Sequence, residues 1–271
     1  MTRGPRDSLL LRGAAEHYDD AAYYDHAYRF RRADVAFYGD VAREHPGPVL
    51  DLGGGSGRVA LPLAAEGHEI TVLDASAPML ARGREQARRM LPEARRRVRF
   101  VRGDMRSFAL GKKFGLVIAP FNVLLHLYEP DDFRRCFACV RGHLARGAKF
   151  VFDVRSPNLS ELRRDPAKVY RTRPFRHPTL GYEVSYSEKF WYEEVKQVQY
   201  ITLRFEPGRG APNGASPMET LLAQRQIFPN ELRALLALGG FTLWRRHGDF
   251  VGGPFDEQSA SQVVWAVPAR R

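Results

Sequence analysis

The chain contains only two cysteines in 271 residues. Cys136 and Cys139 form a single C-x-x-C pair, and because a structural zinc needs four ligands we expect no metal site. The segment 131–144 has the pattern of a helix, in which the cysteines lie close to Phe133 and Phe137. We therefore expect two buried free thiols in a reducing compartment, with a redox pair as the alternative.

Long apolar runs are also absent. The longest, such as 116–120, are far shorter than the roughly 20 residues of a membrane-spanning helix. The first twelve residues lack the sustained apolar segment and the small-residue cleavage site of a signal peptide. We therefore expect a cytoplasmic protein with no membrane partner.

Lysine is scarce, so the net charge of +11 comes almost entirely from arginine. A nucleic-acid-binding surface concentrates basic residues on one face. Here they are spread along the chain, apart from clusters within 29–32 and 95–97, and such a spread can also reflect compositional bias of the source genome. The composition does not favour a nucleic-acid partner. With 44% hydrophobic and 27% charged residues, the chain resembles an ordinary globular protein.

The middle of the chain alternates β-rich runs with helical patterns, which is typical of a parallel sheet with crossover helices. The expected strands cover 48–52, 69–74, 98–102, 114–119 and 148–154. The expected helices cover 58–66, 77–90 and 131–144, and Gly147 is expected to stop the third.

From residue 169 the pattern changes to a two-residue alternation rich in aromatic and β-branched side chains, which indicates antiparallel strands. A helix over 232–238 and strands over 241–247 and 262–267 then follow. These patterns predict an α/β fold: a doubly wound Rossmann-like sheet with a closing antiparallel hairpin, and an antiparallel sheet inserted after the fifth strand. The expected domains are an N-terminal helical lid (1–45), a core (46–168 and 229–271) and the inserted sheet (169–228).

A glycine-rich turn follows the first expected strand, and it reads Asp51-Leu-Gly53-Gly-Gly55-Ser-Gly57. Glycine permits positive φ angles and lets a ligand approach the backbone closely. A dinucleotide fingerprint also fits this turn, but weakly. Its third glycine falls on Arg58 when counted from Gly53, and on Ala60, which the fingerprint allows, when counted from Gly55. An acidic residue before the glycines suits a cationic amino group, and a helix N-terminus suits a carboxylate. The methionine end of S-adenosylmethionine (SAM) carries both groups.

The segments 49–58, 72–76 and 103–105 resemble, in order and spacing, the motifs of the class I SAM-dependent methyltransferase family. This resemblance implies that Asp74 accepts hydrogen bonds from both ribose hydroxyls. It also implies that Asp104 binds the adenine amine and that the Met105 amide faces the ring. The implied cofactor-binding residues, some on the glycine turn and some elsewhere, are Asp51, Gly53, Gly55, Gly57, Arg58, Asp74, Ala75, Met79, Asp104, Met105, Ala119 and Tyr28.

Several of these residues also have a purely structural interpretation. Asp74 could cap the helix that follows it, and Asp104 could be a turn residue. Met79 fits the hydrophobic core as well as it fits an adenine contact. Arg58 could bind the SAM carboxylate or be solvated.

Two residues are candidates for the catalytic role. His126 follows the fourth strand, near the expected position of the methyl group, and could act as a base if the acceptor arrives protonated. Tyr24 belongs to the segment 24–28, which resembles the Tyr-Asp-x-x-Tyr lid of small-molecule members of the family, and it could polarise the acceptor. The alternatives are a histidine that packs under the following helix and an amphipathic helix that docks its aromatic side chains on the core.

The leading hypothesis is a methyltransferase that uses SAM, leaves S-adenosylhomocysteine (SAH), and acts on a nitrogen or oxygen atom of a small molecule. The arrangement resembles that of sugar N,N-dimethyltransferases. The alternatives are methylation of RNA or protein, a SAM-binding protein without transfer activity, and a nicotinamide oxidoreductase. The inserted sheet could serve as a substrate wall or as the surface of a homodimer.

Overall fold

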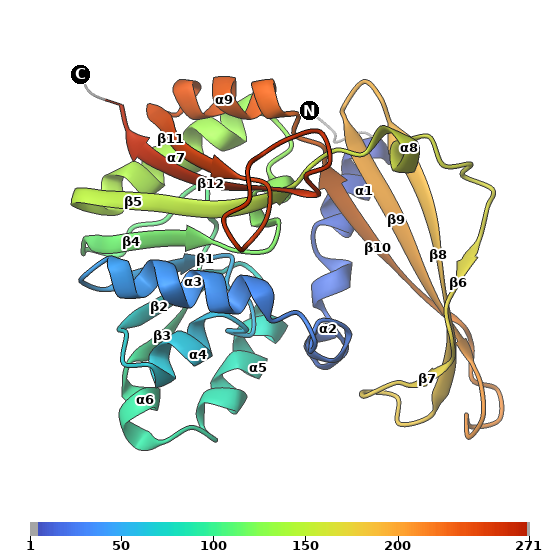
Figure 1. The fold of residues 1–271 in the computed structure, drawn as a ribbon. Coiled ribbons are helices and arrows are strands. Elements are labelled where there is room, and N and C mark those ends of the chain that lie inside the picture. The colour runs from blue at the N-terminus through green and yellow to red at the C-terminus, as the bar shows by residue number, and fades with distance from the viewer. Residues whose placement is uncertain (1–4, 270–271) are drawn as a thin grey trace. The chain divides into compact units, whose positions relative to one another are not determined.

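The computed structural model describes residues 5–269, which form two compact units (Figure 1). The core unit consists of residues 30–156 and 227–269. The sheet unit consists of residues 5–29 and 157–226. Among the described residues, no helix combines the length and the apolar character that crossing a bilayer requires.

The core unit is built on a seven-stranded sheet with the order β11-β12-β5-β4-β1-β2-β3. Strands β1 to β5 pair in parallel, and β12 runs antiparallel to both β5 and β11. This topology confirms the predicted doubly wound sheet with a closing antiparallel hairpin. The strands are β1 (Val49–Leu52), β2 (Ile70–Asp74), β3 (Val98–Arg102), β4 (Phe114–Ala119), β5 (Leu144–Arg155), β11 (Phe241–His247) and β12 (Ser261–Pro268).

Helices cover both faces of this sheet. On one face, α7 (Pro130–His143) and α9 (Pro229–Leu238) pack against the apolar side chains of the strands. On the other, α3 (Ala33–Glu44), α4 (Ala60–Ala65) and α5 (Ala77–Ala87) do the same, and α6 (Pro92–Arg96) leads into β3. Because both faces are covered, all four residues of β1 are buried, as is usual for a parallel sheet.

The connection between α7 and β5 differs from the sequence-based expectation. Helix α7 ends at His143, and β5 begins directly at Leu144. Gly147, expected to stop the helix, lies inside β5 with a φ angle of 79°. The pairing of β4 with β5 is irregular here, so the glycine accommodates an irregularity in the strand rather than a helix end. In α7, Cys136 is a buried free thiol whose pKa is raised by burial, and Cys139 is a partly buried one.

The sheet unit carries an antiparallel sheet with the order β10-β9-β8-β6, and β7 pairs with β8. This is the inserted sheet predicted after the fifth strand. Its strands are β6 (Tyr170–Arg171), β7 (Phe175–Arg176), β8 (Glu183–Glu193), β9 (Val198–Pro207) and β10 (Met218–Arg225). The other elements of this unit are α1 (Pro5–Gly13), η1 (Glu16–Tyr18), α2 (Ala21–Ala27) and α8 (Leu159–Leu162).

Within the sheet unit, the N-terminal helices pack on the sheet strands. A Cβ atom on Gly13 would lie 2.5 Å from the Cβ of Ala223, so the glycine lets α1 approach β10 closely. The compact units therefore place residues 5–29 with the inserted sheet and α3 with the core, whereas the sequence suggested one segment over 1–45. That this segment acts as a lid stays a prediction.

Candidate functional site

The core sheet reverses its strand order at β1, which has β2 on one side and β4 on the other. In doubly wound sheets, ligands bind beyond the carboxyl ends of the strands at such a switch point. Here those ends are Leu52 of β1, Asp74 of β2 and Ala119 of β4. The segments that follow β1, β2 and β4 therefore form the candidate site.

The glycine turn that follows β1 has the backbone conformation that requires glycine. Gly53, Gly55 and Gly57 have φ angles of 66°, 56° and 84°. The Gly53 N–H donates to the Leu73 carbonyl over 2.7 Å, which joins the turn to β2. A Cβ atom on Gly55 would lie 2.8 Å from the Met79 Cε. Met79 is buried and lies outside the main hydrophobic clusters, so its side chain packs against the turn itself.

Asp51, near the end of β1, has an unusual environment. Its side chain is 1% exposed, and neither carboxyl oxygen has a hydrogen-bond partner among the described residues. Burial raises its pKa to about 8, nearby Asp74 adds to this shift, and the charge of Arg58 opposes it. A buried polar group without a partner is costly, so it is expected in a native fold only where a ligand or water completes it.

Asp74, at the end of β2, is bound to the glycine turn. Its Oδ2 accepts the Gly55 N–H over 2.9 Å, and its Oδ1 accepts the Ser76 N–H over 2.7 Å. Burial raises its pKa, and these backbone N–H groups oppose that shift. The Ser76 hydroxyl, not Asp74, caps helix α5 by accepting the Met79 N–H. The capping interpretation of Asp74 is therefore wrong. Ala75, between the two residues, is exposed.

Asp104 follows β3 and is held by Arg106. The guanidinium donates to both carboxyl oxygens, at 3.0 Å from Nε to Oδ1 and 2.7 Å from Nη2 to Oδ2. These hydrogen bonds are the main reason why the pKa of Asp104 is lowered. The Arg106 N–H also donates to Asp104 Oδ1, so Asp104 is a turn residue as well as a candidate adenine contact. Met105 is half-buried against the core.

Arg58, directly after the glycine turn, is neither solvated nor facing open space. Its Nη1 and Nη2 donate to the two oxygens of Asp34, which is fully buried, at 3.0 and 2.6 Å. Arg31 also donates to Asp34, at 2.9 Å. Two guanidinium groups thus share one carboxylate beside the turn. The role of Arg58 in binding the SAM carboxylate stays a prediction, and sequence patterns gave no sign of Asp34.

The segment after β4 begins with buried Ala119 and adopts a strained turn. Phe121 and Asn122 have φ angles of 60° and 65°, a region that non-glycine residues rarely occupy. A Cβ atom on Gly53 would lie 2.6 Å from a methyl group of Val123, so this segment packs directly on the glycine turn. His126 ends the short helix η2 (Val123–His126) and is partly buried.

A buried pair that sequence reasoning missed lies behind this turn. Asp153 of β5 is 1% exposed and accepts the Phe121 N–H at 2.8 Å. The same oxygen, Oδ1, accepts the hydroxyl of fully buried Tyr38 of α3 at 2.7 Å. Periodicity placed 148–154 in a strand but could not pair residues 115 positions apart in sequence. The only signal was an acidic residue directly after the apolar run 150–152 of the strand.

The two tyrosines predicted near the cofactor, Tyr24 and Tyr28, lie in the sheet unit. They form an aromatic cluster with Tyr18 and His17, and the ring centroids of Tyr24 and Tyr28 are 4.8 Å apart. The Tyr28 hydroxyl lies 3.2 Å from His17 Nε2. Burial lowers the pKa of His17 to about 4, so this histidine, which the sequence did not single out, is neutral at neutral pH.

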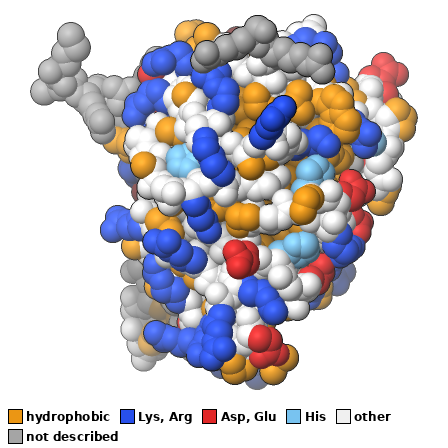
Figure 2. Space-filling view, turned by 90° about the vertical axis from the view of Figure 1, so that its left-hand side faces the viewer, with side chains coloured by type: hydrophobic (Ala, Val, Ile, Leu, Met, Phe, Trp, Pro, Cys, Tyr) orange, Lys and Arg blue, Asp and Glu red, His pale blue; other side chains and the backbone are white. Residues whose placement is uncertain are grey.

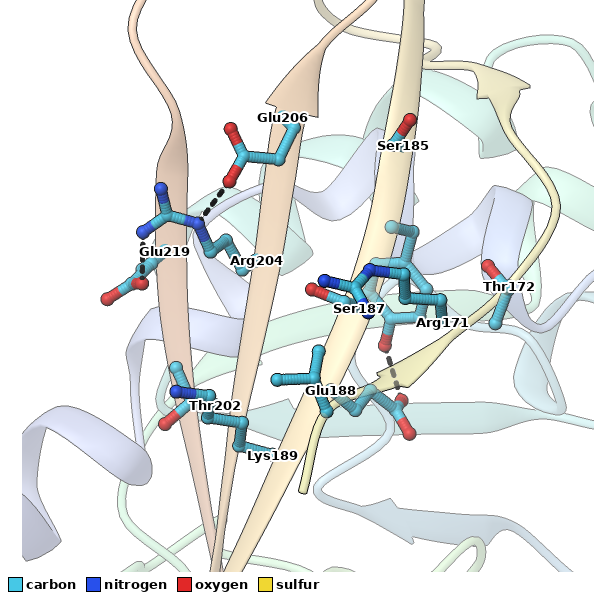
Figure 3. A pocket seen from close by; sticks show the side chains of 12 residues that line it. Arg171, Thr172, Ser185, Ser187, Glu188, Lys189, Thr202, Arg204, Glu206 and Glu219 are labelled. Carbon is cyan, nitrogen blue, oxygen red and sulfur yellow. Dashed lines mark hydrogen bonds and ion pairs between the residues drawn. The ribbon is translucent and has the colours of Figure 1, made fainter. Parts of the chain in front are cut away.

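A separate pocket of about 330 Å³ lies on the antiparallel sheet of the sheet unit (Figure 3). Its arginine Arg204 is paired with Glu206 and Glu219, and the Tyr186 hydroxyl donates to Glu188. The lining carries three basic and three acidic side chains, so its charges balance. The pocket offers hydroxyl groups and paired ions to a ligand rather than one dominant charge.

The structure thus brings together the glycine turn, Asp51, Asp74 and Met79 at the switch point of the core sheet, with the segment that carries His126 packed against the turn. Orphaned Asp51 and the glycine cradle are features of a site built for a ligand with a cationic group and little steric bulk. The Asp51 carboxyl group and the glycine turn fit the methionine end of SAM, which carries an amino group.

Comparison with known proteins supports this assignment. Residues 49–147 match the family model described as a methyltransferase domain. The CcbJ methyltransferase from Streptomyces caelestis has a similar structure, with a TM-score of 0.75 and 26% sequence identity over 88% of this chain and 90% of that chain. The glycopeptide N-methyltransferase MtfA, solved with SAM, has a TM-score of 0.58 and 26% sequence identity over 87% of this chain and 93% of that chain.

CalS10 from Micromonospora echinaspora, an amino pentose methyltransferase, gives a TM-score of 0.60 and 22% identity over 98% of each chain. No curated protein sequence matches the chain. The matched residues contain the glycine turn, Asp74 and Asp104. Residues 49–147 therefore match a methyltransferase domain, and most of the chain has a fold similar to that of solved methyltransferases.

Proposed function

We propose that the protein transfers the methyl group of SAM to a nitrogen or oxygen atom of a small molecule. The observation that carries the cofactor assignment is Asp51, a buried carboxyl group without a partner among the described residues, beside three glycines in the left-handed conformation. When bound, SAM supplies a methyl group that its sulfonium has already activated. The protein then has to bind, orient and desolvate the reactants.

Each strand end has a distinct role in this proposal. Asp51 binds the amino group of the methionine end, whose positive charge favours the ionised carboxylate. Asp74 keeps acceptor capacity for the ribose hydroxyls while two backbone N–H groups fix its orientation. Asp104 and Met105 lie at the end of the neighbouring strand, where the adenine is expected.

The candidates for the acceptor chemistry are His126 of the core unit and Tyr24 of the sheet unit. His126 follows the strained turn after β4 and is the candidate base for an acceptor that arrives as an ammonium or a neutral alcohol. Tyr24 belongs to the aromatic cluster with His17 and is the candidate for polarising the acceptor. Both roles are proposals.

The small-molecule acceptor is supported by the extent of the structural likeness. The similarity to the CcbJ methyltransferase and to the glycopeptide N-methyltransferase covers almost nine-tenths of the chain. An acceptor nitrogen on a modest-sized compound is therefore our first expectation. Methylation of RNA or protein is the second candidate, since the net charge is +11.

The proposal is tested by incubating the protein with methyl-deuterated SAM and panels of small amines, amino sugars and phenols, with RNA and a protein extract in parallel. Mass spectrometry should find the deuterated methyl group on a small molecule, and much less of it at limiting SAM when the Gly55→Ala variant replaces the wild-type protein. Label found only on RNA or protein would overturn the small-molecule assignment. SAM binding without any labelled product would indicate a binding protein.

A further inference from the structure

The strained turn Phe121–Asn122 is held by a buried hydrogen-bond network within the core unit. Two consecutive non-glycine residues with positive φ persist only where the surrounding structure imposes that conformation. The turn is fixed at four points. The Phe121 N–H donates to Asp153 Oδ1, the Asn122 N–H to the Asp153 carbonyl, the Arg155 N–H to Asn122 Oδ1, and the Leu125 N–H to the Asn122 carbonyl.

Asp153 is the centre of this network. One of its oxygens accepts both the Phe121 N–H and the Tyr38 hydroxyl, at 2.8 and 2.7 Å. Tyr38 and Asp153 are both at least 99% buried, so neither group can exchange its partner for water without local opening. Tyr38 therefore links helix α3 to the turn after β4 through a single carboxyl oxygen.

A second set of contacts holds the Phe121 side chain. The Arg31 and Arg58 guanidinium carbons lie 4.5 and 5.0 Å from the centroid of its ring. Both arginines are fixed by Asp34, which lies four residues before Tyr38 on α3. The backbone and the side chain of Phe121 are thus both anchored to α3, one through Tyr38 and the other through Asp34.

We propose that Asp153 and Tyr38 are positioning residues, which hold the Phe121–Asn122 turn so that the segment up to His126 forms the acceptor side of the site. The proposal rests on the methyltransferase function proposed above. The Asp153 carboxylate anchors the turn on the β4 side, whereas Asp51 and Asp74 lie on β1 and β2. Loss of the network should therefore impair acceptor turnover much more than SAM affinity.

The test compares Tyr38→Phe, Asp153→Ala and Asp153→Asn with the wild-type protein. The side-chain amide introduced by Asp153→Asn keeps a carbonyl oxygen that can accept both hydrogen bonds, so this variant should retain most of the activity. Asp153→Ala should lower kcat/KM for the acceptor about a hundredfold and Tyr38→Phe about tenfold, with SAM affinity within about threefold of wild type. The control is Val41→Ala, which removes buried volume one turn further along α3 from an apolar side chain that takes no part in the hydrogen bonds of the network.

Hydrogen exchange of the 121–126 amides, followed by mass spectrometry, provides a readout that does not depend on an acceptor. Exchange should accelerate in Tyr38→Phe and Asp153→Ala but not in Val41→Ala. If Asp153→Ala does not fold, Tyr38→Phe decides the question. Wild-type exchange and turnover in Tyr38→Phe would overturn the proposal, and so would a loss of SAM affinity as large as the loss of turnover. A wild-type protein that methylates nothing would refute the proposed function. The hydrogen-exchange rates and SAM affinities of the variants would then still test whether Asp153 and Tyr38 hold the turn.

Discussion

At the residue scale, the site depends on acidic side chains whose environments differ sharply. Asp51 is buried with no partner among the described residues, Asp74 is bound by backbone N–H groups, and Asp104 is paired with an arginine. Burial raises the pKa values of Asp51 and Asp74, whereas hydrogen bonds from Arg106 lower the pKa of Asp104. Three aspartates at three strand ends therefore differ in their hydrogen-bond partners and in the causes of their pKa shifts.

Asp51→Asn should make the ligand-free protein more stable at alkaline pH. The pKa of Asp51 is raised from 3.8 to about 8, so between these values the folded protein keeps a proton that the unfolded chain has lost. Wild-type stability should therefore fall as the pH rises through this window, and the variant should lack this contribution. We expect a gain of about 1–3 kcal/mol near pH 8, because the amide does not titrate and so avoids the cost of keeping a carboxyl group protonated above its usual pKa.

This expectation is checked by denaturant unfolding of both proteins at about pH 5 and pH 8, together with titration of SAM. The same substitution should weaken SAM binding about tenfold, because an amide cannot balance the amino group's charge. Equal stabilities at both pH values would mean that Asp51 is ionised and satisfied in the folded protein.

His126→Ala should lower turnover far more than SAM affinity, by about 10²–10⁴-fold if His126 is the general base. The measurement is steady-state kinetics with a good acceptor, together with calorimetric titration of SAM. His68→Ala is the matched control, because His68 precedes β2 at the opposite end of the sheet. Unchanged turnover would remove His126 from the mechanism.

At the scale of elements, the strands and their order could largely be predicted from the sequence. Strands β3, β4 and β11 begin and end where the patterns predicted. For β4 the reason is a dense apolar run between Lys113 and Pro120. Short β6 and β7 were missed, since two residues carry no readable alternation. The links from Tyr38 to Asp153 and from Arg58 to Asp34 were also missed, because pairs distant in sequence leave no periodic trace.

The glycine turn is expected to need glycine both for its backbone conformation and for SAM binding. The substitution Gly55→Ala tests this expectation. The substitution places a Cβ atom 2.8 Å from Met79 Cε at a residue with a φ angle of 56°. We expect a loss of about 1–2 kcal/mol in stability and at least about a tenfold loss of SAM affinity. Thermal unfolding and calorimetric titration provide the two measurements.

Gly67→Ala is the control for backbone strain alone. Gly67 has a φ angle of 107°, and a Cβ atom there would meet nothing within 4 Å among the described residues. This variant should be destabilised while its SAM affinity stays at the wild-type value. If both variants bind SAM as the wild-type protein does, the turn does not contact the cofactor closely.

At the scale of the whole molecule, the basic charge is the feature that argues most for a nucleic-acid substrate. Basic side chains are spread over much of the face shown in Figure 2, and acidic and hydrophobic side chains lie between them. Methylation of an uncharged or singly charged small molecule should depend little on salt. Raising the salt concentration from about 50 to 200 mM should change kcat/KM less than about threefold, whereas a complex with many phosphate contacts would lose about a thousandfold in affinity.

The most direct test of the central claim, that the site at the switch point binds SAM, is calorimetric titration of the protein with SAH and, separately, with NADH. We predict saturable binding of one SAH per chain and no binding of NADH. In Asp74→Ala, SAH affinity should fall by about 1–3 kcal/mol through the loss of charge-assisted hydrogen bonds. Binding of NADH in place of SAH, or an SAH affinity that the Asp74 substitution leaves unchanged, would contradict the assignment.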